Sequence, residues 1–507
     1  MLYIIFSQAT VHLLTGELGR LLVEGRLFIE KFEIVKINHF SYPAYNYSIE
    51  NYHWLSAFFM AFIHRGLGFI GLHLLMLLMT LIAVGVYVRF WFKHYNVLWV
   101  GFCSVLCIPM IVHFSEMSIL VFPVVLCVLF MLMNAKLLAG KKFKRHVFLM
   151  VVLQLIWVNI HNSYHLGWIV LFATFLQVWI LHKKSDKYGA LVKPTAQALV
   201  FGLIVSIINP QWWRVWIHPF KLRYANFSST PYEVQNVFTH LANLDTNISA
   251  IDFYIIMLSL TACCALYISW KYSKSKIPVV FLVLILVYTI GFSLFSTQNA
   301  PFLGVVALAI FVLCGHHYIK ERTDSFFWFS YKSPFVILLY FLLPFVFWSA
   351  TEEFFKPVSH KIGLGLAPNA LDATAFIEYT GIQGPFFNNR DAAGAMIFSL
   401  YPNHYPFIDD RANGFPKDLV DRYYFPGLIM EDFKNWHELK NKYAINTIYF
   451  KLEGETNEKL EFLGNRLGDG EWALVYQNKN KDAILLRRNK INMEIIKQYE
   501  INPATRG

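Results

Sequence analysis

The sequence predicts an α-helical polytopic membrane domain followed by a soluble α/β domain. Of the 507 residues, 56% are hydrophobic and only 15% are charged, whereas soluble globular chains carry about 25% charged residues. Residues 1–350 hold 25 Lys and Arg against 12 Asp and Glu, and residues 351–507 hold 19 against 21. The positive charge therefore belongs to the apolar part of the chain, where it reflects membrane topology, and we expect no nucleic-acid partner.

The first element of this prediction is the set of membrane spans. A spanning helix needs roughly 17–25 mainly apolar residues. Ten such stretches, several of them slightly short, and the end of another in residues 1–14 give about eleven spans. The ten stretches are 67–88, 97–112, 117–138, 146–160, 166–182, 194–208, 251–270, 277–296, 301–318 and 334–349.

The loops between these spans alternate in charge. Every second loop is rich in Lys and Arg, as at 141–145 and 183–187, and the short loops between them carry neither residue. Because basic loops stay in the cytoplasm, we expect three segments outside, namely the loops 15–66 and 209–250 and the whole of 351–507. Residues 1–350 would form the transmembrane domain and 351–507 an extracytoplasmic α/β domain.

Two parts of these outer segments have a recognisable pattern. Residues 53–63 form an amphipathic stretch that is long enough to lie in the membrane interface and too short to cross the membrane. In the last domain, alternating apolar residues predict strands at 445–450, 472–477 and 483–488, and segment 430–443 predicts a helix. We find no catalytic motif in this domain, and the six cysteines of the chain have no zinc-binding spacing.

Polar residues gather at the predicted outer surface, whereas no Asp or Glu falls in the middle of a predicted span. A proton- or ion-coupled transporter usually needs such a residue there, so the pattern argues against a lipid or saccharide transporter. A carboxylate at this surface could act as general base on a hydroxyl group. Arg and Lys could hold a lipid-linked phosphate, and aromatic residues could face a sugar ring.

Five stretches resemble motifs of the GT-C glycosyltransferase superfamily, closest to its largely uncharacterised bacterial members, which are distantly similar to protein O-mannosyltransferases and aminoarabinose transferases. Their order and spacing cover nearly the whole chain, although each motif alone is weak. The stretches are HLLTGE (12–17), FSYPAYNYSIENYHWLS (40–56), WVNIHNSYHLG (157–167), NPQWWRVWIHPF (209–220) and PFFNNRDAAGAMIFSLYPNHYPFIDDRA (385–412).

This resemblance implies a GT-C-like fold in a bacterial cytoplasmic membrane. It implies transfer of a sugar from a polyprenyl-phosphate-linked donor to a lipid, glycan or protein acceptor at the outer leaflet. An acidic residue of the first outer loop then acts as catalytic base or binds a metal. Here Phe6 and Gln8 stand where the family has aspartates, and glutamine is neither a general base nor a good metal ligand. The sequence therefore supports no metal site, and a degenerate subunit that binds lipid-linked saccharide without turnover is the alternative.

The candidate residues follow from the same stretches. We expect an acid in the first loop to activate the acceptor, and Arg214 to hold the phosphate. For Asp409, Asp410 and Arg411 we also weigh a local ion pair, and for Arg214 and Trp54 an anchoring role at the membrane surface. The catalytic candidates are Glu17, Glu50, His53 and His161, and the substrate-binding candidates are Trp54, Asn159, Asn162, Asn209, Arg214, Asp410 and Arg411.

Overall fold

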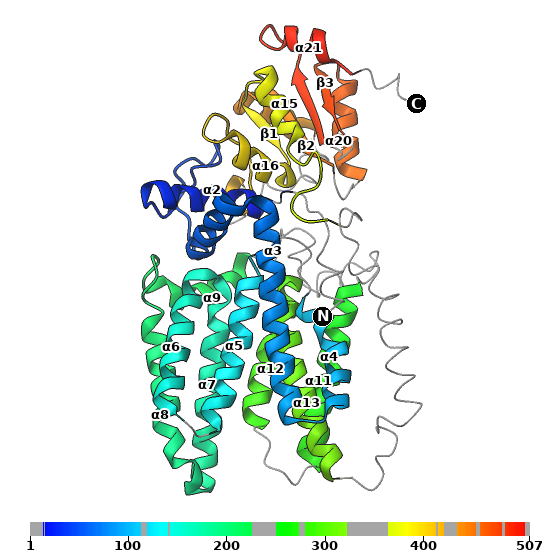
Figure 1. The fold of residues 1–507 in the computed structure, drawn as a ribbon. Helices are drawn as coiled ribbons and strands as arrows, with labels where there is room; N and C mark the ends of the chain where they lie inside the picture. The colour runs from blue at the N-terminus through cyan, green and yellow to red at the C-terminus, as the bar shows by residue number, and fades with distance from the viewer. Residues whose placement is uncertain are drawn as a thin grey trace, which may run out of the picture. The chain divides into compact units, whose positions relative to one another are not determined.

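A computed structural model gives the fold of the chain (Figure 1). It describes residues 14, 16–112, 119–139, 142–225, 250–272, 279–321, 363–411, 414–419, 433–452, 457–478 and 482–501. The chain forms two compact units. The helical unit comprises residues 75–356 with 1–9, and the α/β unit comprises residues 10–74 and 357–507. Hydropathy divides the chain near residue 350, whereas these contacts join the loop 15–66 to the C-terminal part.

The helical unit is a bundle of apolar helices. Within it, α13 packs against α4 and α11, and α7 packs against α8 and α12. Short 3₁₀ turns at Asn162–Tyr164, Asp186–Tyr188 and Thr297–Asn299 join neighbouring helices. Besides the second half of α3 (Trp54–His94), the helices are α4 (Val97–Ile111), α5 (Val121–Leu138), α6 (Phe143–Ile160), α7 (His165–Lys184), α8 (Gly189–Val205), α9 (Arg214–Ala225), α11 (Ala250–Tyr272), α12 (Val279–Phe295) and α13 (Ala300–Glu321).

Six helical stretches among the described residues are long and apolar enough to cross a membrane. They are Trp54–His94, Val121–Leu138, Phe143–Ile160, Asn162–Lys184, Asp186–Val205 and Thr297–Gly315. Three shorter apolar helices, Val97–Ile111, Tyr254–Tyr267 and Val279–Phe295, coincide with further predicted spans. The predicted span 334–349 and almost all of 1–14 lie outside the described residues, so the count of about eleven spans stays a prediction.

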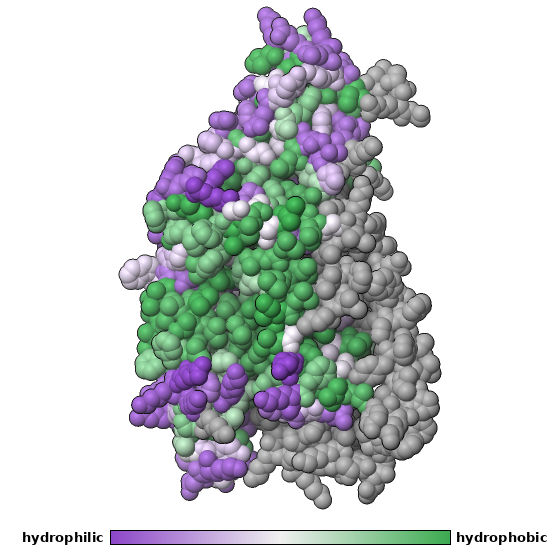
Figure 2. All heavy atoms as spheres, viewed as in Figure 1, coloured by the Kyte–Doolittle hydropathy of each residue, from purple (hydrophilic) through white to green (hydrophobic). Residues whose placement is uncertain are grey.

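Many basic residues of the helical unit lie at one end of its helices. The C-terminal ends of α3 and α7 and the N-terminal ends of α6 and α8 lie together at the bottom of Figure 1. Exposed basic side chains at these ends include Lys93, Lys144, Arg145 and Lys183. Figure 2 shows a hydrophobic band along the helices above a hydrophilic rim at this end. This is the distribution expected of a bundle that crosses a bilayer.

One long helix, α3, changes direction within its length. Gly68 interrupts it with a φ of 63° and a ψ of −165°. Only glycine adopts such a backbone conformation without a steric cost. The part before Gly68 contains residues 54–63 of the predicted amphipathic stretch, and the part after it is mainly apolar up to Val88.

The α/β unit is built on a four-stranded sheet with the strand order β1-β2-β4-β3. Strand β1 (Phe386–Asn388) is parallel to β2 (Thr447–Lys451), whereas β4 (Asp482–Arg487) is antiparallel to both β2 and β3 (Trp472–Gln477). The three predicted strands and the predicted helix, α19 (Phe433–Lys442), are therefore present. Strand β1 was not predicted, because three residues are too few to show a period of two.

Helices cover both faces of this sheet. Because successive side chains of a strand point to opposite faces, Phe387 and Ile448 belong to a core with α19 and α20 (Asn457–Gly468), whereas Phe386 and Tyr449 belong to a second core. That second core includes α15 (Asp372–Thr380), α16 (Arg390–Leu400) and α21 (Met493–Tyr499). A short helix, α17 (Lys417–Leu419), completes the described elements.

The loop 15–66 docks onto this unit through α2 (Gly16–Lys31). Two glycines allow the close approach. A Cβ on Gly19 would lie 2.1 Å from the carbonyl oxygen of Gly394 in α16, and a Cβ on Gly25 would lie 2.0 Å from that of Ala57 in α3. Glycine inside a helix costs about 1 kcal/mol relative to alanine. The two glycines therefore lower the helix propensity of α2, and they allow it to contact the neighbouring backbones closely.

Candidate functional site

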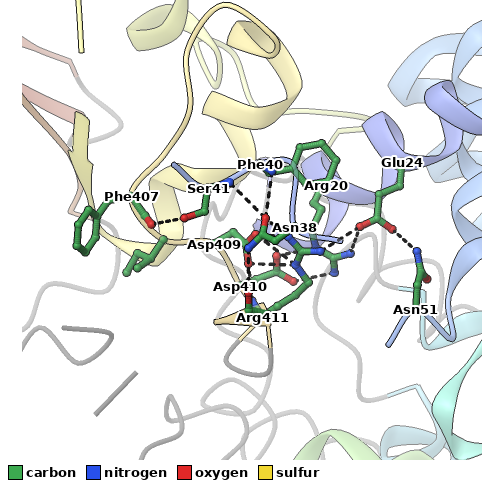
Figure 3. A network of polar contacts seen from close by, with 12 residues as sticks. Arg20, Glu24, Asn38, Phe40, Ser41, Asn51, Phe407, Asp409, Asp410 and Arg411 are labelled. Atoms are coloured by element: carbon green, nitrogen blue, oxygen red, sulfur yellow. Dashed lines mark hydrogen bonds and ion pairs between the residues drawn. The ribbon is translucent and has the colours of Figure 1, made fainter. Parts of the chain in front are cut away.

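The most extensive polar site of the described chain is a buried ionic network in the α/β unit (Figure 3). It comprises Arg20 and Glu24 of α2 and Asp409, Asp410 and Arg411 of the segment after α16. Arg20 binds Asp410 through two hydrogen bonds, from Nε to Oδ1 at 2.9 Å and from Nη2 to Oδ2 at 3.0 Å. This two-point geometry is the strongest that an arginine and a carboxylate can form.

Glu24 links the two arginines of the ionic network. Its Oε1 accepts from Arg20 Nη1 at 2.9 Å and lies 3.5 Å from Arg411 Nη1. Its Oε2 accepts from Asn51 Nδ2 at 3.1 Å. Both carboxylate oxygens of Glu24 are therefore engaged by donors from other residues.

Asp409 and Arg411 form the local part of the network. Asp409 accepts from the backbone N–H of Arg411 at 2.9 Å and pairs with its guanidinium group. This is the local ion pair that the sequence raised for this segment. Arg411 Nη2 also donates to Asn38 Oδ1 at 3.1 Å, and its guanidinium lies 5.6 Å from the centre of the Phe40 ring.

Two buried asparagines hold the segment that carries these charges. Asn388 ends β1, and its Oδ1 accepts from Phe407 N at 2.7 Å while its Nδ2 donates to Ile408 O at 3.0 Å. Asn389 exchanges hydrogen bonds with the backbone of Lys451 in β2. The motif FFNN (386–389) thereby fixes the backbone immediately before Asp409.

The network is buried, and the pKa values of its members follow from their pairing. Arg20, Glu24 and Asp409 are 5%, 3% and 0% exposed. Burial alone would raise the pKa of Asp410, but Arg20 and Arg411 outweigh burial and hold this pKa below its usual value. Burial alone would lower the pKa of Arg20, yet Asp410 and Glu24 hold it well above its usual value. The paired state is therefore the ionised state.

Sequence reasoning missed Arg20, Glu24, Asn38 and Asn51 as members of a site. One local signal was available, because Arg20 and Glu24 stand four residues apart, the spacing that puts opposite charges side by side on a helix. Their contact with Asp410 and Arg411 has no local signal, since about 390 residues separate the partners.

The other predicted residues of the α/β unit lie in the first turn of α2 and at or just before the start of α3. Glu17 is half-buried in the first turn of α2. Glu50 Oε2 accepts from Tyr52 OH at 3.1 Å. His53 precedes α3, and its backbone N–H donates to Asn51 Oδ1 at 3.0 Å. Trp54 begins α3, and its ring lies 5.4 Å from that of Phe28.

A second set of predicted residues lies in the helical unit, at the corner between α6 and α7. Asn159 Nδ2 donates to Leu155 O at 2.9 Å and to Ile208 O at 2.8 Å. Asn209 Nδ2 donates to Val158 O at 2.8 Å, and its Oδ1 accepts from Gln211 N at 2.8 Å. This amide pair, Asn159 and Asn209, ties the end of α6 to the turn after α8.

His161 and Asn162 lie in the same corner. His161 is buried, and its Nδ1 accepts from Ser163 N at 3.1 Å. In the neutral ring this bond leaves the proton on Nε2, so this imidazole is arranged as a donor at Nε2. Asn162 is half-buried in the 3₁₀ turn that follows.

Arg214 begins α9 and is exposed. Its neighbours Trp212, Trp213 and Trp216 are also exposed, by 67%, 57% and 40%. Exposed tryptophans beside an arginine are typical of a membrane interface, where both residue types contact lipid headgroups. The same arginine is suited to bind a phosphate group.

The carboxylates of the ionic network do not fit a metal ion. Each of them pairs with an arginine, and a cation in their place would have to displace that partner. Among the residues that the structure describes, no group of three or more His, Cys, Asp or Glu side chains is arranged to hold a metal.

The comparison with known proteins concerns the fold. No family model and no curated protein matches the sequence. The structure is similar to the crystal structure of the Archaeoglobus fulgidus oligosaccharyltransferase in the apo form, with a TM-score of 0.52 and 11% sequence identity. The similarity covers 95% of this chain and 71% of that chain. At this level of identity it shows the fold alone: this chain folds like that oligosaccharyltransferase.

Proposed function

We propose that this protein is a membrane glycosyltransferase that transfers a sugar from a polyprenyl-phosphate-linked donor to an acceptor at the outer face of a bacterial cytoplasmic membrane. The observation that carries the proposal is the similarity of fold to an oligosaccharyltransferase over 95% of the chain. The basic helix ends described above support a cytoplasmic side for that end of the bundle. The loop 15–66 and residues 351–507 would then be extracytoplasmic.

The contact between Gly16 and Asp410 supports the proposal because it joins two of the stretches that resemble GT-C motifs. Gly16 and Glu17 end the first stretch, and Asp410 and Arg411 end the last one. A Cβ on Gly16 would lie 3.0 Å from the Cβ of Asp410. Two segments almost 400 residues apart thus meet within the α/β unit. The meeting point is next to Glu17, a carboxylate that could serve catalysis.

Glu17 and Glu50 are the acids that we propose for activating the acceptor. Glu24 is unsuited to this role because both of its oxygens are engaged by Arg20, Arg411 and Asn51. The acceptor hydroxyl would lose its proton to a first-loop carboxylate and attack the anomeric carbon, and the bond from that carbon to the phosphate oxygen would break. We propose that Arg214 binds the departing phosphate.

A second candidate function is binding of lipid-linked saccharide without turnover, as a subunit of an envelope complex. Gln8 favours it, because glutamine replaces the expected acid at that position. The two functions share the ligand and differ only in product formation, so a turnover measurement separates them.

The test uses the full chain in lipid nanodiscs with a pool of radiolabelled polyprenyl-phosphate sugars and native envelope extract. Label in an acceptor-bound product is measured. We expect transfer by the wild type and its loss in Arg214→Ala. Arg145→Ala is the matched control, because this exposed arginine lies at the opposite, basic end of the bundle, and it should retain transfer.

The proposed acids are tested in the same assay. The double variant Glu17→Gln with Glu50→Gln should lose transfer, whereas Glu378→Gln, an exposed glutamate on α15, should keep it. Full transfer by the double variant would overturn the proposed role of both acids. Saturable lipid binding without transfer, with an acceptor known to be present, would favour the binding subunit.

A further inference from the structure

An aromatic surface lies at the end of α2 and the start of α3. We define it by six side chains: one in the last turn of α2, one directly after α2, and four at the start of α3. Phe28 is central, with its ring centre 5.4 Å from that of Trp54 and 5.6 Å from that of Phe58. The six residues of the aromatic surface are Phe28, Phe32, Trp54, Phe58, Phe59 and Phe62.

Three of the six side chains are exposed, and Phe28, Trp54 and Phe58 are half-buried. Phe32 is 83% exposed, Phe62 59% and Phe59 41%. Exposed aromatic rings that also contact one another form a contiguous apolar patch, and such patches mark sites of interaction rather than ordinary surface.

The backbone at Phe32 gives independent evidence that the exposed ring has a role. Phe32 follows the last residue of α2 and adopts a φ of 54°, in the left-handed region. Its N–H donates to Phe28 O at 2.9 Å, which closes the helix. Glycine is the usual residue at this capping position, and an aromatic residue adopts the conformation only at an energetic cost. A strained residue whose side chain makes little contact with its own chain indicates a purpose outside folding.

The helix that carries the surface indicates what covers it. α3 continues beyond Gly68 without a connecting loop into a segment apolar enough to cross a membrane. Exposed aliphatic side chains continue along it at Leu67, Ile70, Leu74 and Leu78. The aromatic surface therefore lies a few helical turns before a segment of α3 that is apolar enough to cross a membrane.

The charged residues around the aromatic surface agree with a position near lipid headgroups. Arg26, Lys31 and Arg65 flank it on α2 and α3, and all three are exposed. Aromatic rings beside lysine and arginine side chains are the composition of segments that lie at lipid headgroups. Glu30 lies on the same exposed end of α2, so the surface is not purely cationic.

We propose that the aromatic surface inserts into the headgroup region of the lipid bilayer, with α2 as well as the start of α3 in contact with lipid. The sequence indicates interfacial contact only for residues 53–63, and the structure adds Phe28 and Phe32 of α2 to it. The occupant is a lipid surface, and this inference holds whether or not the protein transfers a sugar.

The test places the photoreactive residue p-benzoylphenylalanine at positions 32, 59 or 62 of the full chain, one position at a time. The protein is reconstituted in nanodiscs of phosphatidylethanolamine and phosphatidylglycerol that contain radiolabelled phospholipid. The matched control is position 379, because Tyr379 is an aromatic residue of α15 that is 81% exposed. We expect lipid label after irradiation at 32, 59 and 62, and only background label at 379.

Lipid label at the three positions no higher than at position 379 would overturn the proposal, as would cross-links to a second protein in place of lipid.

A separate variant tests the reason for Phe32. Phe32→Gly should leave the thermal midpoint unchanged or raise it, because glycine accepts the backbone conformation without strain. A lowered midpoint would show that the ring is needed for folding and would contradict a role toward lipid.

Discussion

The two units of this protein each contain a buried polar network, and the two networks use different chemistry. In the α/β unit, the ionic network pairs ionised side chains with one another, as in the contact between Arg20 and Asp410. In the helical unit, the amide pair Asn159 and Asn209 bonds neutral side chains to backbone carbonyls and amides. The ionic network joins segments about 390 residues apart, whereas the amide pair joins segments about 50 residues apart.

This difference in chemistry follows from the free-energy cost of burying each kind of side chain. A buried ion pair must recover the cost of removing two charges from water, so it is tolerated only with near-complete pairing. A neutral amide costs far less to bury, and it can satisfy backbone groups that a helix end leaves without partners. The apolar bundle therefore holds its corner with amides, and the α/β unit holds its loop with charges. The predictions below test this contrast.

The largest effect is expected from removing one charge of the ionic network. Arg20→Met leaves Asp410 and Glu24 buried without their main partner, and we expect a loss of about 3–5 kcal/mol in the free energy of unfolding. Thermal and chemical unfolding of the purified chain measure this. Arg26→Met, an exposed position on the same helix, should change stability little. Equal losses in the two variants would show that the ionic network has no special role.

The next effect concerns the contact that brings α2 to the network. Gly19→Ala places a Cβ 2.1 Å from the Gly394 carbonyl oxygen. Because the obstacle is backbone, α2 must shift, and we expect a loss of about 3 kcal/mol. The control is Gly464→Ala in α20, where a Cβ would meet nothing within 4 Å. There the higher helix propensity of alanine should stabilise the protein by up to about 1 kcal/mol. A neutral Gly19→Ala would mean that α2 docks without close backbone contact.

A smaller effect is expected in the amide pair. Asn209→Ala removes the donor to Val158 O and the acceptor of Gln211 N. We expect a loss of about 2 kcal/mol, because these two hydrogen bonds and a longer one to Asn159 Oδ1 at 3.3 Å are all neutral, so no charge is left unpaired. The thermal midpoint in nanodiscs measures it, with Asn162→Ala, half-buried in the same corner, as the variant of smaller effect. A loss of stability as large as that of Arg20→Met would contradict the proposed difference between the two networks.

The smallest effect is the dependence of stability on pH, which we expect to differ between the two networks. The pKa of Asp410 lies below its usual value of 3.8 in the folded protein. Its stabilising contribution is therefore fully present above the unfolded value and disappears as the pH falls through the lower, folded value. The stability difference between the wild type and Asp410→Asn should be constant at neutral pH and shrink in acid. The difference between the wild type and Asn209→Ala should not change with pH over the same range.

The sequence predicted the parts of this fold that depend on local periodicity. The apolar stretch 97–112 corresponds to α4, and the alternating stretch 472–477 coincides with β3. These elements are long enough for hydropathy to identify them. The helix α2 was not predicted, although its polar residues were noted, because two interior glycines weaken its helical signal.

The candidate site was predicted only in fragments. Asp410 and Arg411 were selected by resemblance, and the structure shows what they contact. Glu24 was not selected, although it connects the two arginines. The partners of a buried ion pair can lie anywhere in the chain, so sequence spacing does not reveal them. The proposed roles of Glu17, Glu50 and Arg214 stay predictions for the assays described above.

The α/β unit is built from two segments that lie far apart in the sequence, and this has a consequence for its biosynthesis. Its first segment ends at Leu74 and its second begins at Pro357, so about 280 residues are translated between them. At about 5–20 residues per second this takes on the order of 15–60 s. During that interval α2 carries Arg20 and Glu24 before Asp410 and Arg411 exist. The nascent chain must therefore make most of its apolar helices first, and any ribosomal stop before residue 409 leaves Arg20 and Glu24 without Asp410 and Arg411.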